Sequence, residues 1–385
     1  MRVPYAPRVC CVKHVDINLF AHRFERCFDF PRSKKYAKSL IKAGSRITSL
    51  ESVYNNYGGP PPDSFFHFFK YPLEKVIEDM DGFFESQARL LDLHGSTIAI
   101  DTNDVAYWGE KDEYVHRKKG VTKNISVHRY SLCSFVDSRR KLALSCLPVS
   151  KKDDGMEIVR SHLEKAKRLL HVRTVLFDRG YYNASILKNT EDMGLEYVIP
   201  LRKNQRTDRL WEEAKKTGRT KIPYKLKGDH DHMQTWLYLD KKPIEQDKKE
   251  EEDECDDRKT RRVRKRKKWY DPVKEREYIG VLSNKDVPLD KVQEFMNWYY
   301  VRNNIETAFK EKNLYRIITS SKDKVYRYLI YCISLYIMNL VQIVRQTNNT
   351  YFRNDEMKKL LEILLGQGRP LIGEHWLSRT LKVIA

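Results

Sequence analysis

The stretch VRTVLFDRGYYN, residues 172–183, decides how this chain folds. Five of the seven residues up to Asp178 are apolar or β-branched, which favours a buried strand, and the chain then becomes polar at once. An Asp-x-Gly sequence also suits a simple turn, so a single carboxylate at a strand end has an ordinary explanation. A functional interpretation requires further carboxylates directed at the same point.

The composition favours a polyanionic partner. The chain has 385 residues, with 73 Lys and Arg against 53 Asp and Glu, a formal charge of +20 and a pI near 9.4. Such an excess favours nucleic acid before membrane, because each neutralised phosphate releases a counterion. Composition alone also allows ribosomal and other basic proteins. The length predicts one large core with appended parts, or two to three domains.

The cysteines and the apolar segments indicate a cytoplasmic protein. Seven cysteines are scattered without a repeated CxxC, so the sequence predicts neither a zinc cluster nor a disulfide framework. The N-terminal segment carries charge within its apolar run and lacks the core of a signal peptide. The apolar segment 328–344 contains Ser334, Asn339 and Gln342, which favours a buried core helix over the alternative of a membrane span.

Residues 1–92 are predicted to form a helical, basic, DNA-binding domain. In FPRSKKYAKSLIKAGSRI the apolar positions recur with helical spacing and lysines occupy the other faces, and GGPPP at 58–62 then breaks the chain. The lysines expected to contact DNA are Lys34, Lys35, Lys38 and Lys42. The alternative for this region is an ordinary solvated basic surface.

Residues 93–204 are predicted to form the first part of an α/β core. Strand-like text at 96–102, 125–138 and 141–150 is followed by a helix at 154–170, the strand ending at Asp178, a helix at 182–193 and a strand at 196–202. The second and third strands are expected to pair antiparallel. Alternation of strand and helix late in this region predicts a mixed sheet with helices packed on it.

Residues 205–277 interrupt this rhythm and are interpreted as an insertion. Residues 245–257 contain nine acidic and two basic residues, and residues 258–268 contain nine basic and no acidic ones. Opposed charge blocks of this kind predict a solvated, self-neutralising loop; contact with DNA and a localisation signal are the alternatives for the basic half. Residues 278–345 would complete the core with a strand at 276–284 and a long helix at 288–313, and residues 346–385 would form a helical tail.

Three carboxylates occupy distinctive positions in this scheme. Asp101 closes the first strand, Asp178 closes the fourth, and Glu306 lies in the long helix. The first and fourth strands can lie side by side and parallel, which would bring the two aspartates together. Converging carboxylates repel one another, and hard divalent cations remove that cost, so the pattern predicts two Mg²⁺ or Mn²⁺ ions that act on a phosphodiester. Asp104 is the alternative to Asp101.

The long helix also carries a regular polar spacing. Tyr299, Arg302 and Glu306 stand at i, i+3 and i+7, so a continuous helix would present all three on one face. The alternative is an ordinary surface stripe with an Arg–Glu pair.

The segments IAIDT, LFDRGYYN and YYVRNNIETAFKEK together resemble the DDE transposases of bacterial and archaeal insertion sequences, in the group with a Tyr-x2-Arg-x3-Glu signature. The resemblance covers residues 94–204 and 276–340 and includes the long insertion. It implies an RNase H-like fold with a mixed five-stranded sheet. It also implies that the three carboxylates hold two metal ions and that Tyr299 and Arg302 contact the DNA backbone near the scissile phosphate.

The sequence departs from that group at two positions. Asn313 stands where the group has Lys, with Lys310 and Lys312 as nearby substitutes, and Asn303 stands where many members have Trp. These lysines, together with Lys203, are therefore the remaining candidates for contact with DNA.

The function implied by the resemblance is cleavage of DNA at the ends of an insertion sequence and strand transfer into target DNA by transesterification. The implied partners are double-stranded DNA and a second copy of the chain assembled on it, in the nucleoid of a prokaryote and without a membrane. The alternatives are a two-metal nuclease of the same fold that does not join strands, and a non-catalytic DNA-binding protein derived from a transposase.

Overall fold

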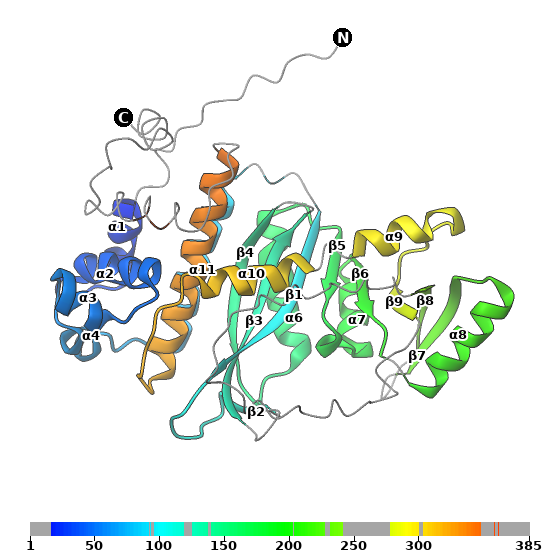
Figure 1. Ribbon diagram of the computed structural model, residues 1–385, viewed down its shortest axis with the longest axis horizontal. Helices are drawn as coiled ribbons and strands as arrows, with labels where there is room; N and C mark the ends of the chain where they lie inside the picture. The colour runs from blue at the N-terminus through cyan, green and yellow to red at the C-terminus, as the bar shows by residue number, and fades with distance from the viewer. Residues whose placement is uncertain are drawn as a thin grey trace, which may run out of the picture.

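The computed structural model describes residues 17–91, 93, 96–118, 125–137, 140–202, 204–227, 232–241, 278–299, 303–347, 358 and 361. These residues form a mixed α/β structure in which a long twisted sheet is flanked by helices (Figure 1). The predicted fold class is therefore confirmed.

Five helices precede the sheet, as predicted for this region. They are α1 Ile17–Cys27, α2 Ser33–Arg46, α3 Leu50–Tyr57, α4 Pro62–Phe68 and α5 Leu73–Ala88. In α2 the residues Tyr36, Ala37, Leu40 and Ile41 are all buried, which is the face expected from their spacing. The break at 58–62 arises because Gly58 and Gly59 adopt φ of 70° and 137°, and α4 then begins at a proline, which needs no amide donor in a first turn.

The N-terminal helices share one hydrophobic core with the sheet. Helix α5 packs against β4 (Lys141–Val149) and α11 (Lys324–Thr347). Between them, the buried amide of Gln87 donates to the carbonyl of Tyr336 at 3.0 Å and accepts from Asn339 at 3.0 Å. In the described part of the chain, one hydrophobic core thus extends across the predicted boundary near residue 92. A separate N-terminal domain stays a prediction.

The sheet has nine strands in the described residues, in the order β2-β3-β1-β5-β6-β9-β8-β7, with β4 paired to β3. The strands are β1 Thr97–Ala106, β2 Val115–Lys118, β3 Ile125–Val136, β4 Lys141–Val149, β5 Thr174–Phe177, β6 Glu196–Pro200, β7 Lys221–Lys227, β8 His232–Lys241 and β9 Tyr278–Ser283. Strands β3 and β4 pair antiparallel, and β1 lies parallel to β5, both as predicted. The run β4-β3-β1-β5-β6 is the predicted five-stranded unit, but the complete sheet is larger.

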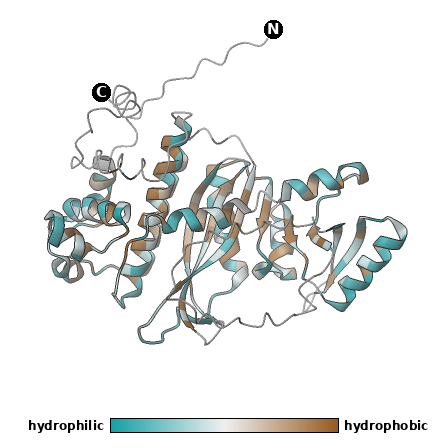
Figure 2. Ribbon diagram, in the orientation of Figure 1, coloured by the Kyte–Doolittle hydropathy of each residue, from teal (hydrophilic) through white to brown (hydrophobic). Residues whose placement is uncertain are grey.

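The additional strands correct the prediction that regular structure stops after residue 204. Helix α8 (Gln205–Thr217) precedes β7 and β8, which join the sheet through β9. The ring of Trp211 on α8 stacks on Tyr278 of β9 at 4.9 Å, and the outer face of α8 is largely hydrophilic (Figure 2). The two predicted charge blocks, 245–257 and 258–268, lie outside the described residues.

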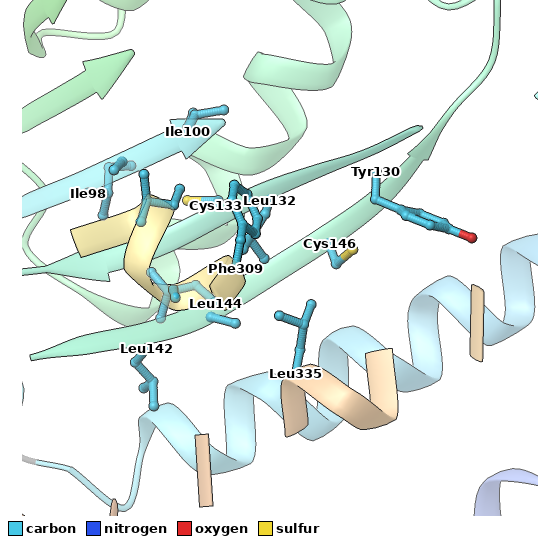
Figure 3. Close-up of a cluster of buried hydrophobic side chains, with 14 of the residues drawn as sticks. Ile98, Ile100, Tyr130, Leu132, Cys133, Leu142, Leu144, Cys146, Phe309 and Leu335 are labelled. Carbon is cyan, nitrogen blue, oxygen red and sulfur yellow. The ribbon is translucent and has the colours of Figure 1, made fainter. Parts of the chain in front are cut away.

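Helices cover both faces of the sheet. Helices α6 (Gly155–Leu169) and α7 (Ala184–Asp192) pack on one face, where His162 of α6 meets Ser131 of β3 and Ser145 of β4. Helices α10 (Asn303–Asn313) and α11 pack on the other, and Phe309 and Leu335 point from them towards the strands (Figure 3). Neighbouring residues of a strand point to opposite faces of the sheet. Ser131 meets His162 of α6, whereas the next residue, Leu132, faces Phe309 of α10 in Figure 3.

The predicted helix 288–313 corresponds to several described segments. The turn η3 (Leu289–Lys291) leads into α9 (Val292–Tyr299), and α10 begins at Asn303, while residues 300–302 lie outside the described residues. The predicted core helix at 328–344 is confirmed as part of α11. Among the described helices, α11 has the length and apolar composition of a membrane span, and that apolar window is completely buried inside the protein.

Candidate active site

Asp101 and Asp178 stand side by side where two parallel strands meet. In the β1–β5 pair, Ile100 lies opposite Phe177, so the two aspartates are the next residues of the same register. The amide of Asp178 donates to the carbonyl of Ile100 at 3.3 Å, which extends the ladder to this position. The structure thus brings the two aspartates together as predicted, but Asp101 does not close its strand. Strand β1 continues to Ala106 because it stays paired with β3 beyond the end of β5, so only Asp178 stands at a strand end.

The strand ends at Asp178 because the chain turns there. A short 3-10 turn, η2 (Arg179–Tyr181), follows β5, and the Asp178 carboxylate accepts from the amide of Gly180 at 3.3 Å as its N-cap. The simple turn interpretation is therefore correct as local structure. A carboxylate has about four lone-pair sites, so capping and metal binding are compatible roles for the same side chain.

Asp101 projects towards the face covered by α10. It lies opposite Leu132 of β3 and two residues before Asn103, and residues at these positions share one face of a sheet. The amide oxygen of Asn103 accepts from Lys312 Nζ of α10 at 3.2 Å. Asp101 itself is 7% exposed, so its carboxylate is held at a partly shielded position beneath the surface.

A buried polar chain lies beneath the two aspartates on the other face. Tyr181 OH lies 2.8 Å from Ser131 Oγ, which lies 2.9 Å from His162 Nε2, and Ser145 Oγ lies 2.6 Å from His162 Nδ1. The pKa of Tyr181 is raised mainly by burial, and the nearby charges of Asp101 and Asp178 raise it further. The phenol thus stays protonated and ties the turn after Asp178 to the centre of the sheet.

His162, the histidine of this buried polar network, is neutral. Burial, with a contribution from Lys165, lowers the pKa of His162 to about 3. A neutral imidazole has one donor and one acceptor nitrogen, which matches its two serine partners. The sequence indicated none of the four residues of this network, because the contacts join positions that are far apart along the chain.

Glu306 lies in the first turn of α10 and is exposed. Ile305, Ala308 and Phe309 form the buried side of this helix, so Glu306 and Lys310 lie on its outer side, one turn apart. In the part of the chain that the structure describes, no three His, Cys, Asp or Glu side chains are grouped closely enough to hold a metal ion. The structure therefore joins Asp101 with Asp178 and does not bring Glu306 into one cluster with them.

The paired aspartates nevertheless suit a hard divalent cation. Mg²⁺ is commonly bound through one or two carboxylates, with waters and substrate phosphates completing its coordination shell. Asp101 and Asp178 supply two carboxylates on neighbouring strands, one within β1 on the face covered by α10 and the other in the turn after β5. The third predicted ligand stays a prediction.

The other predicted residues of this region differ in accessibility. Tyr299 is 7% exposed at the end of α9, whereas Lys310 is exposed. Lys312 is 3% exposed and turned inwards, so it is not a surface cation. Arg302 and Lys203 lie outside the described residues, and the proposed common face of Tyr299, Arg302 and Glu306 is therefore untested.

The lysines of α2 also differ from one another. Lys34, Lys35 and Lys38 are exposed or partly exposed, and Lys34 Nζ lies 2.7 Å from His22 Nε2. Lys42 is 5% exposed, with its ammonium 3.7 Å from the ring centroid of Tyr57. Three of the four lysines are thus accessible to a partner, and the fourth stabilises the packing of α2 on α3.

Asp104, the alternative to Asp101, has an evident structural role. Its carboxylate accepts from Arg129 at 2.8 Å and pairs with Lys118 at 3.1 Å. Burial by itself would raise the pKa of Asp104, but these two cations outweigh it and hold that pKa below its usual value. Asp137, Asp153 and Asp154 accept backbone amides in turns or at a helix start, as expected for capping residues.

Similarity to known proteins is found among solved structures and protein families. No curated protein matches the chain. Among solved structures, one similar chain is described as a piggyBac transposase synaptic complex with hairpin DNA, with 12% identity and a TM-score of 0.46; the match covers 87% of this chain and 64% of that one, slightly under two thirds.

The family described as Transposase DDE domain matches residues 88–337, which is more than half of the chain and contains both aspartates and Glu306. The chain therefore belongs to the transposase DDE domain family.

Proposed function

We propose that the protein is a DNA transposase that cleaves DNA at the ends of a mobile element and joins the released 3′ ends to target DNA by in-line transesterification. The observation that carries the proposal is the placement of Asp178, directly after β5, beside Asp101 of β1, within a match to the transposase DDE domain. Acidic side chains paired in this way repel one another unless a cation joins them.

In this proposal Asp101 and Asp178 hold Mg²⁺ or Mn²⁺, in a site for two ions, and Glu306 is the third ligand. The bound metal supplies activation of a water or 3′-hydroxyl on one side of the phosphodiester and stabilisation of the leaving oxygen on the other. Helix α10 lies on the face of Asp101, and Glu306 stands six residues, or about 9 Å along the helix, before Lys312, which contacts β1. That placement supports Glu306 as a residue that approaches the pair when DNA and metal are bound.

The charge of the chain supports DNA as the partner. The formal net charge is +20, and the accessible lysines of α2 offer contacts to a phosphate backbone. We propose that two copies act together on DNA, because a transposition event joins two element ends.

The experiment uses the full chain and a labelled duplex from the DNA that flanks its reading frame, with a target plasmid. Mg²⁺ or Mn²⁺ should give nicked and joined products, whereas Ca²⁺ should permit binding with little cleavage, because the chemistry depends on ion size and coordination. Excess EDTA should abolish both products. Full cleavage in EDTA contradicts the metal-dependent mechanism, and cleavage without joining in Mg²⁺ would favour the nuclease alternative.

A further inference from the structure

A cavity of about 150 Å³ lies between β1, α10 and α11, and its lining on β1 begins at Asn103, two residues after Asp101. Asn103 and Asp104 line it from β1, Lys312 from α10, and Arg327 and Tyr331 from α11; Arg316, in the segment that joins the two helices, also lines it. Asn313, at the end of α10, and Arg316 are both exposed, so the cavity opens to solvent there.

The described lining of the cavity carries an excess of positive charge. Lys312, Arg316 and Arg327 all border it, and Asp104 is the one acidic residue of that lining. The carboxylate of Asp104 pairs with two other cations, Arg129 and Lys118. No carboxylate among the described residues pairs with the three cations.

Lys312 is the most informative of these cations. It is 3% exposed, its Nζ donates to Asn103 Oδ1 at 3.2 Å, and it lies 4.1 Å from the ring centroid of Tyr331. Tyr331 OH donates to the same Oδ1 at 3.2 Å, so the amide oxygen is shared by two donors. An ammonium has three donors, which leaves two of those of Lys312 without a described protein acceptor.

A buried ammonium without a counter-charge is unfavourable, because its lost hydration is not replaced. Burial lowers the pKa of Lys312 to about 7, and the charge of Arg316 lowers it as well. An anion in the cavity would supply both the missing charge and the missing acceptors. Arg316 adds a planar donor group of the kind that matches phosphate oxygens. Arg327, which already donates to the carbonyls of Ser321 and Ala106, adds a further positive charge.

The size of the cavity limits what the anion can be. A volume of about 150 Å³ is smaller than the roughly 300 Å³ or more of pockets that enclose drug-sized ligands. The cavity therefore suits a small anion such as a single phosphate group.

We propose that this cavity binds one phosphate group, and that during the reaction the group is a phosphodiester of the DNA strand held at Asp101 and Asp178. The cavity begins at Asn103, two residues or about 6.6 Å along β1 from Asp101, so a strand bound at the aspartates passes its mouth. The assignment to DNA rests on the proposed transposase function, whereas the binding of phosphate as such does not.

The first test uses the full-length, metal-free protein and inorganic phosphate at constant ionic strength. Phosphate should raise the melting temperature saturably above the effect of chloride, because a ligand that binds the folded state stabilises it. Arg316→Gln should weaken phosphate binding roughly tenfold, the expected loss for one charge-assisted hydrogen bond. Lys188→Gln, which removes an exposed lysine of α7, is the control and should bind phosphate as the parent does.

A second variant keeps this test independent of folding. Lys312→Met removes the buried charge and keeps most of the side-chain volume, so the phosphate-free protein should be at least as stable as the parent while the stabilisation by phosphate is reduced. An unsaturable response in the parent, or unchanged phosphate binding by both Arg316→Gln and Lys312→Met, overturns the cavity as an anion site.

The source of the phosphate is tested with end-containing duplexes that carry one neutral methylphosphonate at successive positions. At one position the substitution should weaken binding by the parent and have no further effect on Arg316→Gln, because both changes remove the same contact. If phosphate binds but no position shows this behaviour, the DNA assignment is overturned and the site takes free phosphate. If phosphate binds but the protein neither cuts nor joins DNA, the proposed function fails while the anion site stands.

Discussion

The amide of Asp178 donates to the carbonyl of Ile100, and this bond fixes Asp178 beside Asp101 at the edge where β1 and β5 run parallel. This backbone bond to β1, made in the turn directly after β5, therefore sets the position of Asp178 relative to Asp101. Such preorganisation suits a site in which both side chains hold the same ions, because reorganisation would otherwise oppose binding.

The hydroxyl of Tyr181 should act as a positioning group for Asp178. Tyr181→Phe removes the bond to Ser131 and should destabilise the fold by about 1 kcal/mol, the usual contribution of one hydrogen bond. It should also raise the Mg²⁺ concentration required for half-maximal cleavage, since the turn after Asp178 is less firmly held.

The control is Tyr197→Phe, which removes a comparable buried bond, from Tyr197 OH to Thr235 at 2.9 Å, far from the strand ends. It should lose similar stability and keep the metal dependence of the parent. Identical metal titrations for Tyr181→Phe and the parent would show that the hydroxyl has a structural role alone.

Two buried histidines should make the fold sensitive to acid. Burial lowers the pKa of His162 to about 3 and that of His128 to about 4, against about 6.5 in an unfolded chain. Below pH 6.5 the unfolded state binds protons that the folded state does not, so the free energy of unfolding decreases as the pH falls from 6.5 towards 4. Each histidine contributes a slope of up to about 1.4 kcal/mol per pH unit.

Urea unfolding between pH 4.5 and 7.5 measures this slope for the parent and for His162→Gln, which keeps hydrogen-bonding capacity without titrating. Below pH 6.5 the free energy of unfolding should depend less steeply on pH in the variant than in the parent. Above pH 6.5 the two dependences should be similar. Parallel curves over the whole range would mean that His162 is not held neutral in the folded protein.

The accessible lysines of α2 should contribute to DNA binding. Replacing Lys34, Lys35 and Lys38 together by Gln should weaken binding and reduce the salt slope by up to about 0.9 for each phosphate that the variant no longer neutralises. Fluorescence anisotropy across a salt titration measures both quantities.

The control for the α2 variant replaces Lys167, Arg168 and Lys188 by Gln, because α6 and α7 cover the face of the sheet opposite α10. It removes the same charge and should keep most of the salt slope. Equal reductions in the two triple variants would indicate a general effect of net charge and no specific role for α2.

The sequence predicted the aspartate pair because the signals there are local. An apolar run that ends in Asp locates both residues, although it marks the end of β5 alone and β1 continues past Asp101 to Ala106. A helix between β4 and β5 indicates how β5 returns beside β1. Strands β7 and β8 are not predicted from the sequence, because the nearby charges suggest a solvated insertion. Yet Ile222, Tyr224 and Leu226 alternate with other residues, as expected for a strand.

The buried polar contacts could not be predicted in the same way. His162 meets Ser131 across 31 positions of sequence, and only the tertiary fold brings them together. Lys312 is expected at the surface from its residue type, yet it shares helical spacing with the buried Ile305, Ala308 and Phe309. This helical spacing is the sequence signal for burial of Lys312, but the general preference of lysine for the surface outweighs it.

The central claim is that Asp178 binds metal for strand cleavage and joining, and substitution with a softer ligand tests it most directly. Asp178→Ala should abolish joining in Mg²⁺ and in Mn²⁺. Asp178→Cys should be inactive in Mg²⁺, which prefers oxygen ligands, and recover part of its joining activity in Mn²⁺, which accepts softer ones. Asp192→Asn, at an exposed helix end, is the control and should join as the parent does. Joining by Asp178→Ala in Mg²⁺ at the parental rate would contradict the account.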